Sequence, residues 1–350
     1  MGPELEPTIQ LGHGGGGRLS QQLLHGLLLP GLGISANGLH DAALLPLGGQ
    51  PGQPSLAYTT DSYVVRPLCF PGGDIGRLAV IGTVNDLAMA GATPLALGLG
   101  LILEEGLPIA TLQTVVNSIQ EAAAACGVAV VTGDTKVVER GKGDGLYINT
   151  SGVGVVSERL VCAGRPIHPG AIGRGDAVLV SGDLGRHGIA ILAAREQLGL
   201  RTTLLSDLAS LLEPVQALLE QGLTPHCLRD LTRGGLASAV DEIARSAQRC
   251  IDLEEGAIPV DIAVQGACDL LGLDPLAMAN EGRMVVILPS DQAEAALAVL
   301  QRFQPQAARI GTVGEAFTAG QRLHPVRLHS SLGVWRPLDL GQGELLPRIC

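Results

Sequence analysis

Apolar residues along the chain recur at strand-like and helical spacings in alternation. In the first half these spacings predict strands at 56–65, 95–103, 128–131 and 146–156 and helices at 75–90 and 109–125. Apolar strands that alternate with helices are typical of layered α/β folds. We therefore expect an N-terminal α/β domain at 55–165.

A second α/β pattern follows a junction rich in proline and glycine at 165–175. Strands and helices are predicted there at 177–181, 187–198, 207–221, 235–247, 284–288, 291–303 and 308–313. We expect this C-terminal domain to span 170–325. On its flanks we expect a glycine-rich N-terminal arm at 1–54, with one short helix at 19–29, and a flexible tail at 326–350.

The composition agrees with this fold class and narrows the range of partners. Of the 350 residues 46% are hydrophobic but only 2% are aromatic, so the core must consist mainly of aliphatic side chains. The net charge of −11 argues against a nucleic-acid partner, because phosphate backbones are bound by concentrated Lys and Arg. The uncharged span 87–103 is shorter than the roughly 20 residues of a membrane helix and contains Pro94, so we expect no membrane partner.

The cysteines indicate a reduced protein. There are 7 of them, an odd number, without a Cys-x-x-Cys pair or zinc-like spacing. The sequence also lacks the basic and apolar stretches of a secretory signal at its start. We therefore expect a cytoplasmic location.

Four aspartates lie at the ends of apolar segments or within them, where a carboxylate needs a partner: Asp61, Asp86, Asp134 and Asp230. Magnesium bound to nucleotide phosphates prefers a few carboxylate oxygens. Asp86 is the most telling, since Ala, Leu, Met and Gly surround it. Its alternative role is a polar stripe on a helix surface, and a hydrophilic loop is the alternative for Asp134.

Two further residues are candidates for proton transfer. Lys136 and Lys142 are the only lysines, and an ammonium group is deprotonated far more readily than a guanidinium group. Glu281 precedes the apolar run 284–288 and is a candidate general base. A solvated loop glutamate remains the alternative for Glu281.

Two glycine-containing loops are candidates for phosphate binding. The loop from Asp230 to Gly235, which includes Arg233, leads into a predicted helix, so its N–H groups can meet an anion or simply cap that helix. The glycine run after His13 has no P-loop ending, and a flexible linker is its alternative.

The last residue, Cys350, is the sharpest single feature. Its thiol lies beside an α-carboxylate, which raises rather than lowers a thiol pKa, so a carrier role fits better than that of a fast nucleophile. From Leu338 an extended tail reaches roughly 40 Å at about 3.3 to 3.6 Å per residue. The thiol can thus visit two active sites, unless the cysteine is accidental.

Several blocks together resemble the HypE family of hydrogenase-maturation proteins. The resemblance runs from about His13 to Cys350 and is carried by Thr60-Asp61-Ser62-Tyr63-Val64, Phe70-Pro71-Gly72-Gly73-Asp74-Ile75-Gly76, Asn85-Asp86, Ile102-Leu103-Glu104-Glu105-Gly106-Leu107-Pro108, Gly133-Asp134-Thr135-Lys136-Val137-Val138, Asp230-Leu231-Thr232-Arg233-Gly234-Gly235 and Pro347-Arg348-Ile349-Cys350. It implies the two-domain fold of aminoimidazole ribonucleotide synthetase, with a barrel-like dimer interface built by the N-terminal domains. The stretch 31–54 departs from what we expect of relatives.

The resemblance also implies an activity. In the family, HypF places a carbamoyl group on the terminal cysteine, HypE dehydrates it to a thiocyanate with ATP and Mg²⁺, and the cyanide passes to iron held by HypC and HypD. By resemblance Cys350 is the carrier, and Lys136 and Glu281 handle protons. Metal and nucleotide binding is implied for Asp61, Asp86, Asp134 and Asp230, and phosphate contact for His13, Asn85, Thr135 and Arg233.

Two other functions remain open from sequence. One is a kinase or synthetase of the same fold that acts on a diffusible small molecule and does not need Cys350. The other is a nucleotide-switched scaffold that recruits maturation partners through its tail. For the dehydratase we expect the closed tail to bring Cys350 near Glu281 and Lys136, because the reacting groups must lie within a few ångströms.

Overall fold

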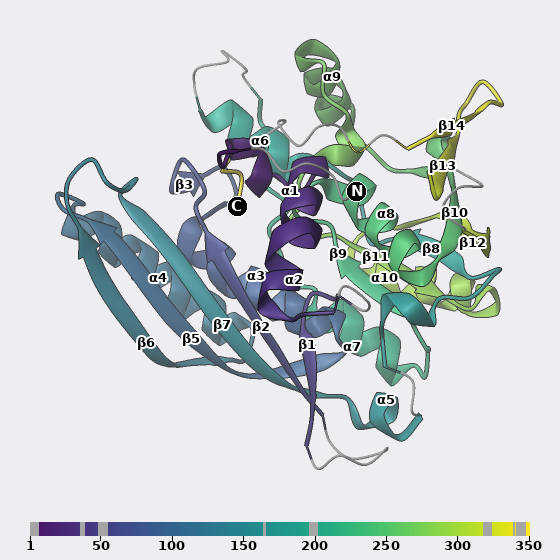
Figure 1. The fold of residues 1–350 in the computed structure, drawn as a ribbon, viewed down its shortest axis with the longest axis horizontal. Coiled ribbons are helices and arrows are strands. Elements are labelled where there is room, and N and C mark those ends of the chain that lie inside the picture. The colour runs from purple at the N-terminus through teal and green to yellow at the C-terminus, as the bar shows by residue number, and fades with distance from the viewer. Residues whose placement is uncertain are drawn as a thin grey trace.

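A computed structural model describes residues 7–35, 39–47, 55–163, 166–195, 202–317, 324–338, 340 and 348–350, without the side chains of 162 and 163. Parts of the predicted arm, of the helix predicted at 187–198 and of the tail lie outside these ranges. Within them the chain forms two α/β halves, each built on one large sheet (Figure 1). The α/β class predicted from the sequence is thus confirmed.

The N-terminal sheet has the strand order β1-β2-β7-β5-β6. Its strands are β1 (Ala43–Pro46), β2 (Ser55–Tyr63), β5 (Ala92–Glu104), β6 (Ala129–Val138) and β7 (Leu146–Val156). Neighbours are antiparallel except β5 and β6, which are parallel. The edge strand β1 comes from the segment that we assigned to the arm, so that segment contributes to the sheet.

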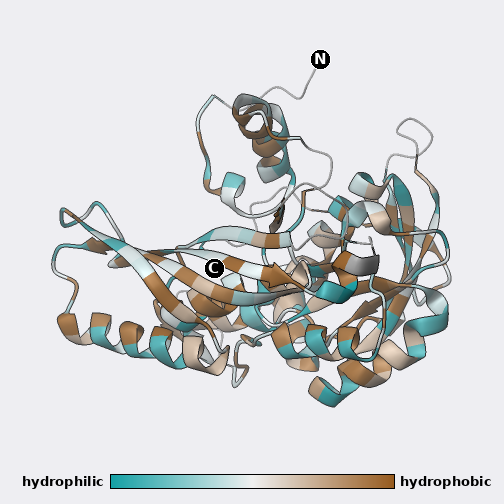
Figure 2. Ribbon diagram, turned by 90° about the horizontal axis from the view of Figure 1, so that it is seen from below, coloured by the Kyte–Doolittle hydropathy of each residue, from teal (hydrophilic) through white to brown (hydrophobic). Residues whose placement is uncertain are grey.

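Helices α3 (Ile75–Met89) and α4 (Ile109–Ala125) cover one face of this sheet. α3 is apolar on all sides and almost fully buried, because it also packs against the C-terminal half. α4 is amphipathic and lies along the outside (Figure 2). On the opposite face Tyr58 and Ile102 are each 43% exposed, and a helical stretch at 18–32 stands on this side of the sheet (Figure 2).

The C-terminal sheet has the order β14-β13-β10-β12-β8-β11-β9. Its strands are β8 (Ala177–Val180), β9 (Cys227–Asp230), β10 (Arg249–Glu254), β11 (Met284–Leu288), β12 (Ala308–Ala316), β13 (Val326–His329) and β14 (Trp335–Pro337). Its helices are α6 (Arg186–Ala194), α7 (Leu212–Glu220), α8 (Gly235–Ala247), α9 (Ile262–Leu271) and α10 (Ala293–Phe303). The sequence pattern had not predicted β10, α9, β13 or β14.

The remaining elements are short. They are η1 (Leu11–Gly14), α1 (Arg18–Leu23), η2 (Leu24–Leu28), α2 (Leu29–Leu32), β3 (Cys69–Phe70), β4 (Gly73–Asp74), α5 (Glu158–Ala163), η3 (Pro169–Ala171), η4 (Glu255–Ala257), η5 (Pro275–Ala277) and η6 (Ser290–Gln292). The helix predicted at 19–29 is therefore present, as a continuous helical stretch from α1 to α2. None of the helices in the described ranges is long and apolar enough to cross a membrane.

One hydrophobic core joins the two halves. It contains residues of α3 and of the N-terminal sheet together with Leu179, Met284 and Val286 of the C-terminal sheet. Ile349, next to the end of the chain, belongs to the same core. The junction between the two halves therefore buries Ile349 and partly buries Cys350.

Candidate active site

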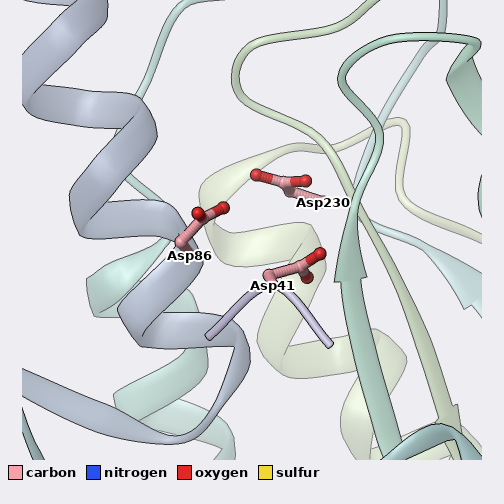
Figure 3. A group of neighbouring side chains, drawn as sticks. All are labelled: Asp41, Asp86 and Asp230. Atoms are coloured by element: carbon pink, nitrogen blue, oxygen red, sulfur yellow. The ribbon is translucent and has the colours of Figure 1, made fainter. Parts of the chain in front are cut away.

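Three carboxylates meet where the two halves join. Asp86 comes from α3, Asp230 ends β9, and Asp41 lies in the segment before β1; one oxygen from each lies within 4.8 Å of the others (Figure 3). The hydroxyl of Thr59 on β2 donates a hydrogen bond of 2.6 Å to Asp86. Side chains from distant parts of the sequence thus form one acidic cluster, which we define as Asp41, Asp86 and Asp230.

The acidic cluster is electrostatically strained. Burial raises the pKa of Asp86 well above its usual value, and the negative charges of Asp61, Asp230 and Asp41 raise it further. Burial is also the main cause of the raised pKa of Asp230, and it raises the pKa of Asp41 to about 6. A divalent cation would relieve this repulsion.

The two carboxylate oxygens of Asp41 have different surroundings. Its Oδ1 pairs with Arg229 Nε at 2.6 Å, and Arg229 is in turn held by Glu242 at 2.6 Å. Its Oδ2 is buried and accepts no hydrogen bond. One oxygen is therefore oriented by a cation while the other is left for a ligand, and this donor set fits Mg²⁺.

Asp61 lies beside the acidic cluster rather than in it. It pairs across the sheet with Thr150, which is buried, so both residues face α3. The hydroxyl of Tyr63 donates to its carboxylate at 3.3 Å, and its charge raises the pKa of Asp86. Asp61 thus supplies a fourth negative charge to the same space.

Glu281 is buried on the other side of this space. The residue is only 2% exposed, and its Oε1 has no hydrogen-bond partner. Burial, followed by the charges of Asp230 and Asp207, raises its pKa well above the usual value. When ionised, such a carboxylate is a strong base, as a proton acceptor in a site needs to be.

The end of the chain docks into the same space. Ile349 is buried, and the main-chain oxygen of Cys350 accepts a hydrogen bond of 3.1 Å from the N–H of Val64. Burial raises the pKa of the Cys350 thiol strongly; the charge of Glu281 raises it further, whereas that of Arg233 lowers it. The docked thiol is therefore protonated and lies within electrostatic range of Glu281.

Asp134, Thr135 and Lys136 are not brought to this space by the single chain. They lie on the edge strand β6 and are exposed, with Lys136 paired to Asp134. Asp134 aligns with Gly100 of β5, whereas the alternate residues of β5, Leu99 and Leu101, pack against the core. Asp134 and Lys136 therefore face away from α3, on the opposite side of the sheet from Asp61.

The other predicted phosphate ligands have varied surroundings. Asn85 is buried and binds main-chain groups, since it donates to the carbonyl of Ala209 at 3.1 Å and accepts from the N–H of Leu211 at 2.7 Å. These contacts hold the loop before α7. They give Asn85 a structural role and leave its predicted phosphate contact untested.

His13 and Arg233 lie near each other through the glycine run. The carbonyl of Gly16 accepts from Ser238 Oγ in the first turn of α8 at 2.9 Å. A Cβ on Gly16 would lie 2.7 Å from the carbonyl oxygen of Arg233, so only glycine fits this approach. The glycine run therefore packs on the loop that enters α8, where Arg233 is exposed and His13 is half-buried.

Sequence reasoning missed Asp41. It lies in a stretch rich in glycine and proline that we read as an arm. The signal was an acid directly before the apolar run Ala42–Leu45, the same setting that identified the other aspartates. Only its distance in sequence from Asp86 and Asp230 concealed it.

Known proteins resemble the whole chain. Residues 39–156 match the family model of the AIR synthase related protein, N-terminal domain, and residues 173–320 match that of the C-terminal domain. The chain is 46% identical to carbamoyl dehydratase HypE of Rhodobacter capsulatus over 99% of each chain. It is 47% identical to carbamoyl dehydratase HypE of Escherichia coli (strain K12) over 98% of this chain and 99% of the relative.

Solved structures agree with these relatives. A HypE–HypF complex superimposes with a TM-score of 0.81 at 39% identity, covering 91% of this chain and 99% of the other. A HypE structure in complex with ATP gives 0.78 at 45% identity, covering 98% and 100%. A ThiL protein complexed with AMPPCP and TMP gives 0.64 at 19% identity over 92% and 96%, which shows a shared fold only.

Proposed function

The chain belongs to the HypE family of carbamoyl dehydratases, which are enzymes of hydrogenase maturation, and we propose that its substrate is a carbamoyl group on its own Cys350. The product is a thiocyanate on the same sulfur, and ATP drives the loss of water. The observation that supports the proposal is the docked tail, in which the Cys350 thiol lies within the electrostatic influence of Glu281, Asp61 and Asp230.

The chemistry explains the need for ATP. In the group Cys350–S–C(=O)–NH₂ the oxygen is a poor leaving group. Transfer of a phosphoryl group from ATP to that oxygen makes phosphate the leaving group, with one N–H proton lost. Cleavage of the C–O bond and loss of the second N–H proton then give Cys350–S–C≡N and phosphate, so ATP takes up the water that is formally removed.

Asp41, Asp86 and Asp230, with Asp61 beside them, would hold Mg²⁺ with the nucleotide phosphates. When bound, the ion neutralises charge on the phosphoryl group during its transfer. The loop from Asp230 to Gly234 and the first N–H groups of α8 lie next to the cluster and can donate to phosphate oxygens. HypE in complex with ATP supports the nucleotide part of this proposal.

Glu281 would accept the N–H protons. Its Oε1 is free of hydrogen bonds, and its pKa is raised, so the ionised carboxylate binds a proton strongly once substrate displaces nearby water. The exposed charge of Arg233 near Cys350 can stabilise negative charge on the carbamoyl oxygen or the departing phosphate.

A second copy of the chain would supply Lys136. The outer face of the N-terminal sheet, opposite to α3, carries exposed Tyr58 and Ile102 and leaves Asp134 and Lys136 in solvent. We propose that this face pairs with its counterpart in a homodimer. Each chain would then carry Asp134, Thr135 and Lys136 to the acidic cluster of its partner, and Lys136 would act with Glu281 on the substrate nitrogen.

The proposed partners follow from the substrate. A HypF protein, seen in complex with HypE, would load the carbamoyl group, and a HypC–HypD complex would receive the cyanide for the iron of a nickel–iron hydrogenase. The carrier chemistry requires Cys350 as a free thiol, which a reducing cytoplasm maintains. We therefore propose a cytoplasmic location.

Intact-protein mass spectrometry tests the function directly. The chain is incubated with HypF, carbamoyl phosphate and ATP, and then with Mg²⁺ and ATP alone. We expect a gain of one carbamoyl group followed by the loss of one water, and both should be absent from Cys350→Ala. ATP consumption without an adduct on Cys350 would instead indicate a kinase for a diffusible small molecule.

A further inference from the structure

The docked tail is held mainly through its main-chain oxygens. The carbonyl of Arg348 accepts from the N–H of Arg66 at 3.3 Å and from Arg195 Nη2 at 2.6 Å. The main-chain oxygen of Cys350 accepts from Val64, as described above. The carbonyl between them, that of Ile349, lies 2.8 Å from Nε2 of His187.

His187 is fully buried and has a defined tautomer. Its Nδ1 lies 2.8 Å from Ser206 Oγ, and the same Oγ accepts from the N–H of Leu208 at 3.1 Å. The carbonyl oxygen of Ile349 can only accept, and burial lowers the pKa of His187, so the neutral ring carries its proton on Nε2 and Nδ1 accepts from the Ser206 hydroxyl. The ring of Phe70 packs edge-on against the imidazole, with centroids 5.4 Å apart, and fixes its plane.

Asp207 connects this histidine to Glu281. The Asp207 carboxylate is buried and accepts from the N–H of His187 at 3.2 Å. It also accepts from the N–H groups of Glu281 and Gly282, at 3.3 and 3.2 Å. A Cβ on Gly282 would lie 2.1 Å from the Asp207 carbonyl oxygen, so the two loops are in close contact. The start of α6 and the Glu281 loop are thus fastened to one carboxylate.

We propose that His187 is a positioning residue for the dehydration: its Nε2–H holds the Ile349 carbonyl and so positions the Cys350 thiol relative to Glu281. Asp207 connects the backbone of His187 to that of Glu281 and keeps the two in register. The catalytic consequence of this role rests on the proposed function. The docking of the tail is independent of that function and can be measured on the protein without any substrate. His187 does not touch the reacting atoms, since its two ring nitrogens are occupied by Ile349 and Ser206.

The test uses the full chain and two measurements. The first is the rate of alkylation of Cys350 by iodoacetamide, followed by peptide mass spectrometry. The second is the rate of water loss from the carbamoyl-loaded protein in a single turnover with Mg²⁺ and ATP. His187→Phe keeps a ring of similar size but removes the donor, whereas His187→Gln keeps a donor, and His226→Phe is the matched control away from the tail.

We expect His187→Phe to raise Cys350 alkylation about tenfold and to slow water loss about tenfold, as the loss of one buried hydrogen bond predicts. Carbamoyl loading by HypF should be no slower than in the wild-type chain, because loading requires the undocked tail. His187→Gln should restore most of both rates, and His226→Phe should change neither. If His187→Phe does not fold, His187→Gln and Ser206→Ala are compared instead, and Ser206→Ala should raise alkylation about threefold.

Two results would overturn the inference. The first is wild-type alkylation of Cys350 in every folded variant of His187 and Ser206. The second is faster alkylation with an unchanged rate of water loss. If the wild-type chain loses no water at all, the proposed function fails, but the alkylation rates still show whether His187 holds the tail.

Discussion

The acidic cluster and the outer face of β6 place charge in opposite ways. In the cluster, Asp86 and Asp230 carry pKa values raised by burial and by mutual repulsion. On β6, hydrogen bonds from Lys136 and from the N–H of Thr135 lower the pKa of Asp134, and both side chains are exposed. The acidic cluster thus concentrates negative charge in the interior. The ammonium group of Lys136, in contrast, lies in solvent and is paired with Asp134.

The difference agrees with the proposal that a cation and a second copy of the chain complete the site. An exposed ion pair contributes only about 0–1 kcal/mol, so β6 neither gains nor loses much from its charges. Buried acids without a cation are costly, and such strain is typical of functional sites. We infer that the cluster is completed from outside, by Mg²⁺ and nucleotide and by Lys136 of a second copy.

Replacement of the buried base should have the largest effect. We expect Glu281→Gln to slow water loss from carbamoylated Cys350 by roughly 10²–10⁴-fold, because the amide cannot accept the N–H protons. Carbamoyl loading and the melting temperature should be little changed. Glu121→Gln, the same substitution on the exposed side of α4, serves as control. A Glu281→Gln chain that forms thiocyanate at half the wild-type rate would remove Glu281 from the mechanism.

Replacement of one cluster acid should have an intermediate effect. In the wild-type chain, Mg²⁺ with ATP should raise the free energy of unfolding by about 2.7 kcal/mol when the nucleotide is at a hundred times its Kd. Asp86→Asn should abolish most of this gain, because the donor set loses a charged oxygen. Thermal unfolding with and without Mg²⁺ and ATP measures it. Asp269→Asn on exposed α9 should keep the full gain, and an unchanged gain in Asp86→Asn would argue against a metal at the cluster.

A charge on the outer sheet face should have the smallest effect per chain. We expect Ile102→Asp to convert a dimer to a monomer in sedimentation velocity and to slow water loss about tenfold, because an unpaired charge at an interface is unfavourable. Ile262→Asp is the matched control, since Ile262 is 89% exposed on α9, away from this sheet. Dimers that persist in Ile102→Asp, with unchanged activity, would contradict the proposed use of this face.

Local patterns in the sequence predicted much of the fold. The continuous apolar character of 75–90 identified α3, and the apolar runs on either side identified β2 and β5. β10 was missed because charges interrupt its apolar residues, as in Arg249–Glu254. Its stability comes from neighbours in the sheet rather than from local spacing.

The candidate site was predicted only in part, for a physical reason. Asp86, Asp230 and Glu281 stand out because an acid next to an apolar segment is costly in any fold. The strand period of two places Asp134 and Lys136 on one face, but it does not say which face carries α3. That choice depends on packing between distant segments, as does the meeting of Asp41 with Asp86.

The docked tail has a consequence for how the protein behaves at different concentrations. Because the last residues bind to their own chain through a few main-chain hydrogen bonds, the substrate is present at a fixed local concentration however dilute the protein is. Docking of the substrate is therefore independent of dilution, and the rate of a single turnover depends on concentration only through the proposed dimer. The product occupies the same dock and blocks it, so further turnover depends on how readily the tail leaves. Tighter docking would speed the chemistry and delay the transfer of cyanide, which favours a latch of only moderate strength.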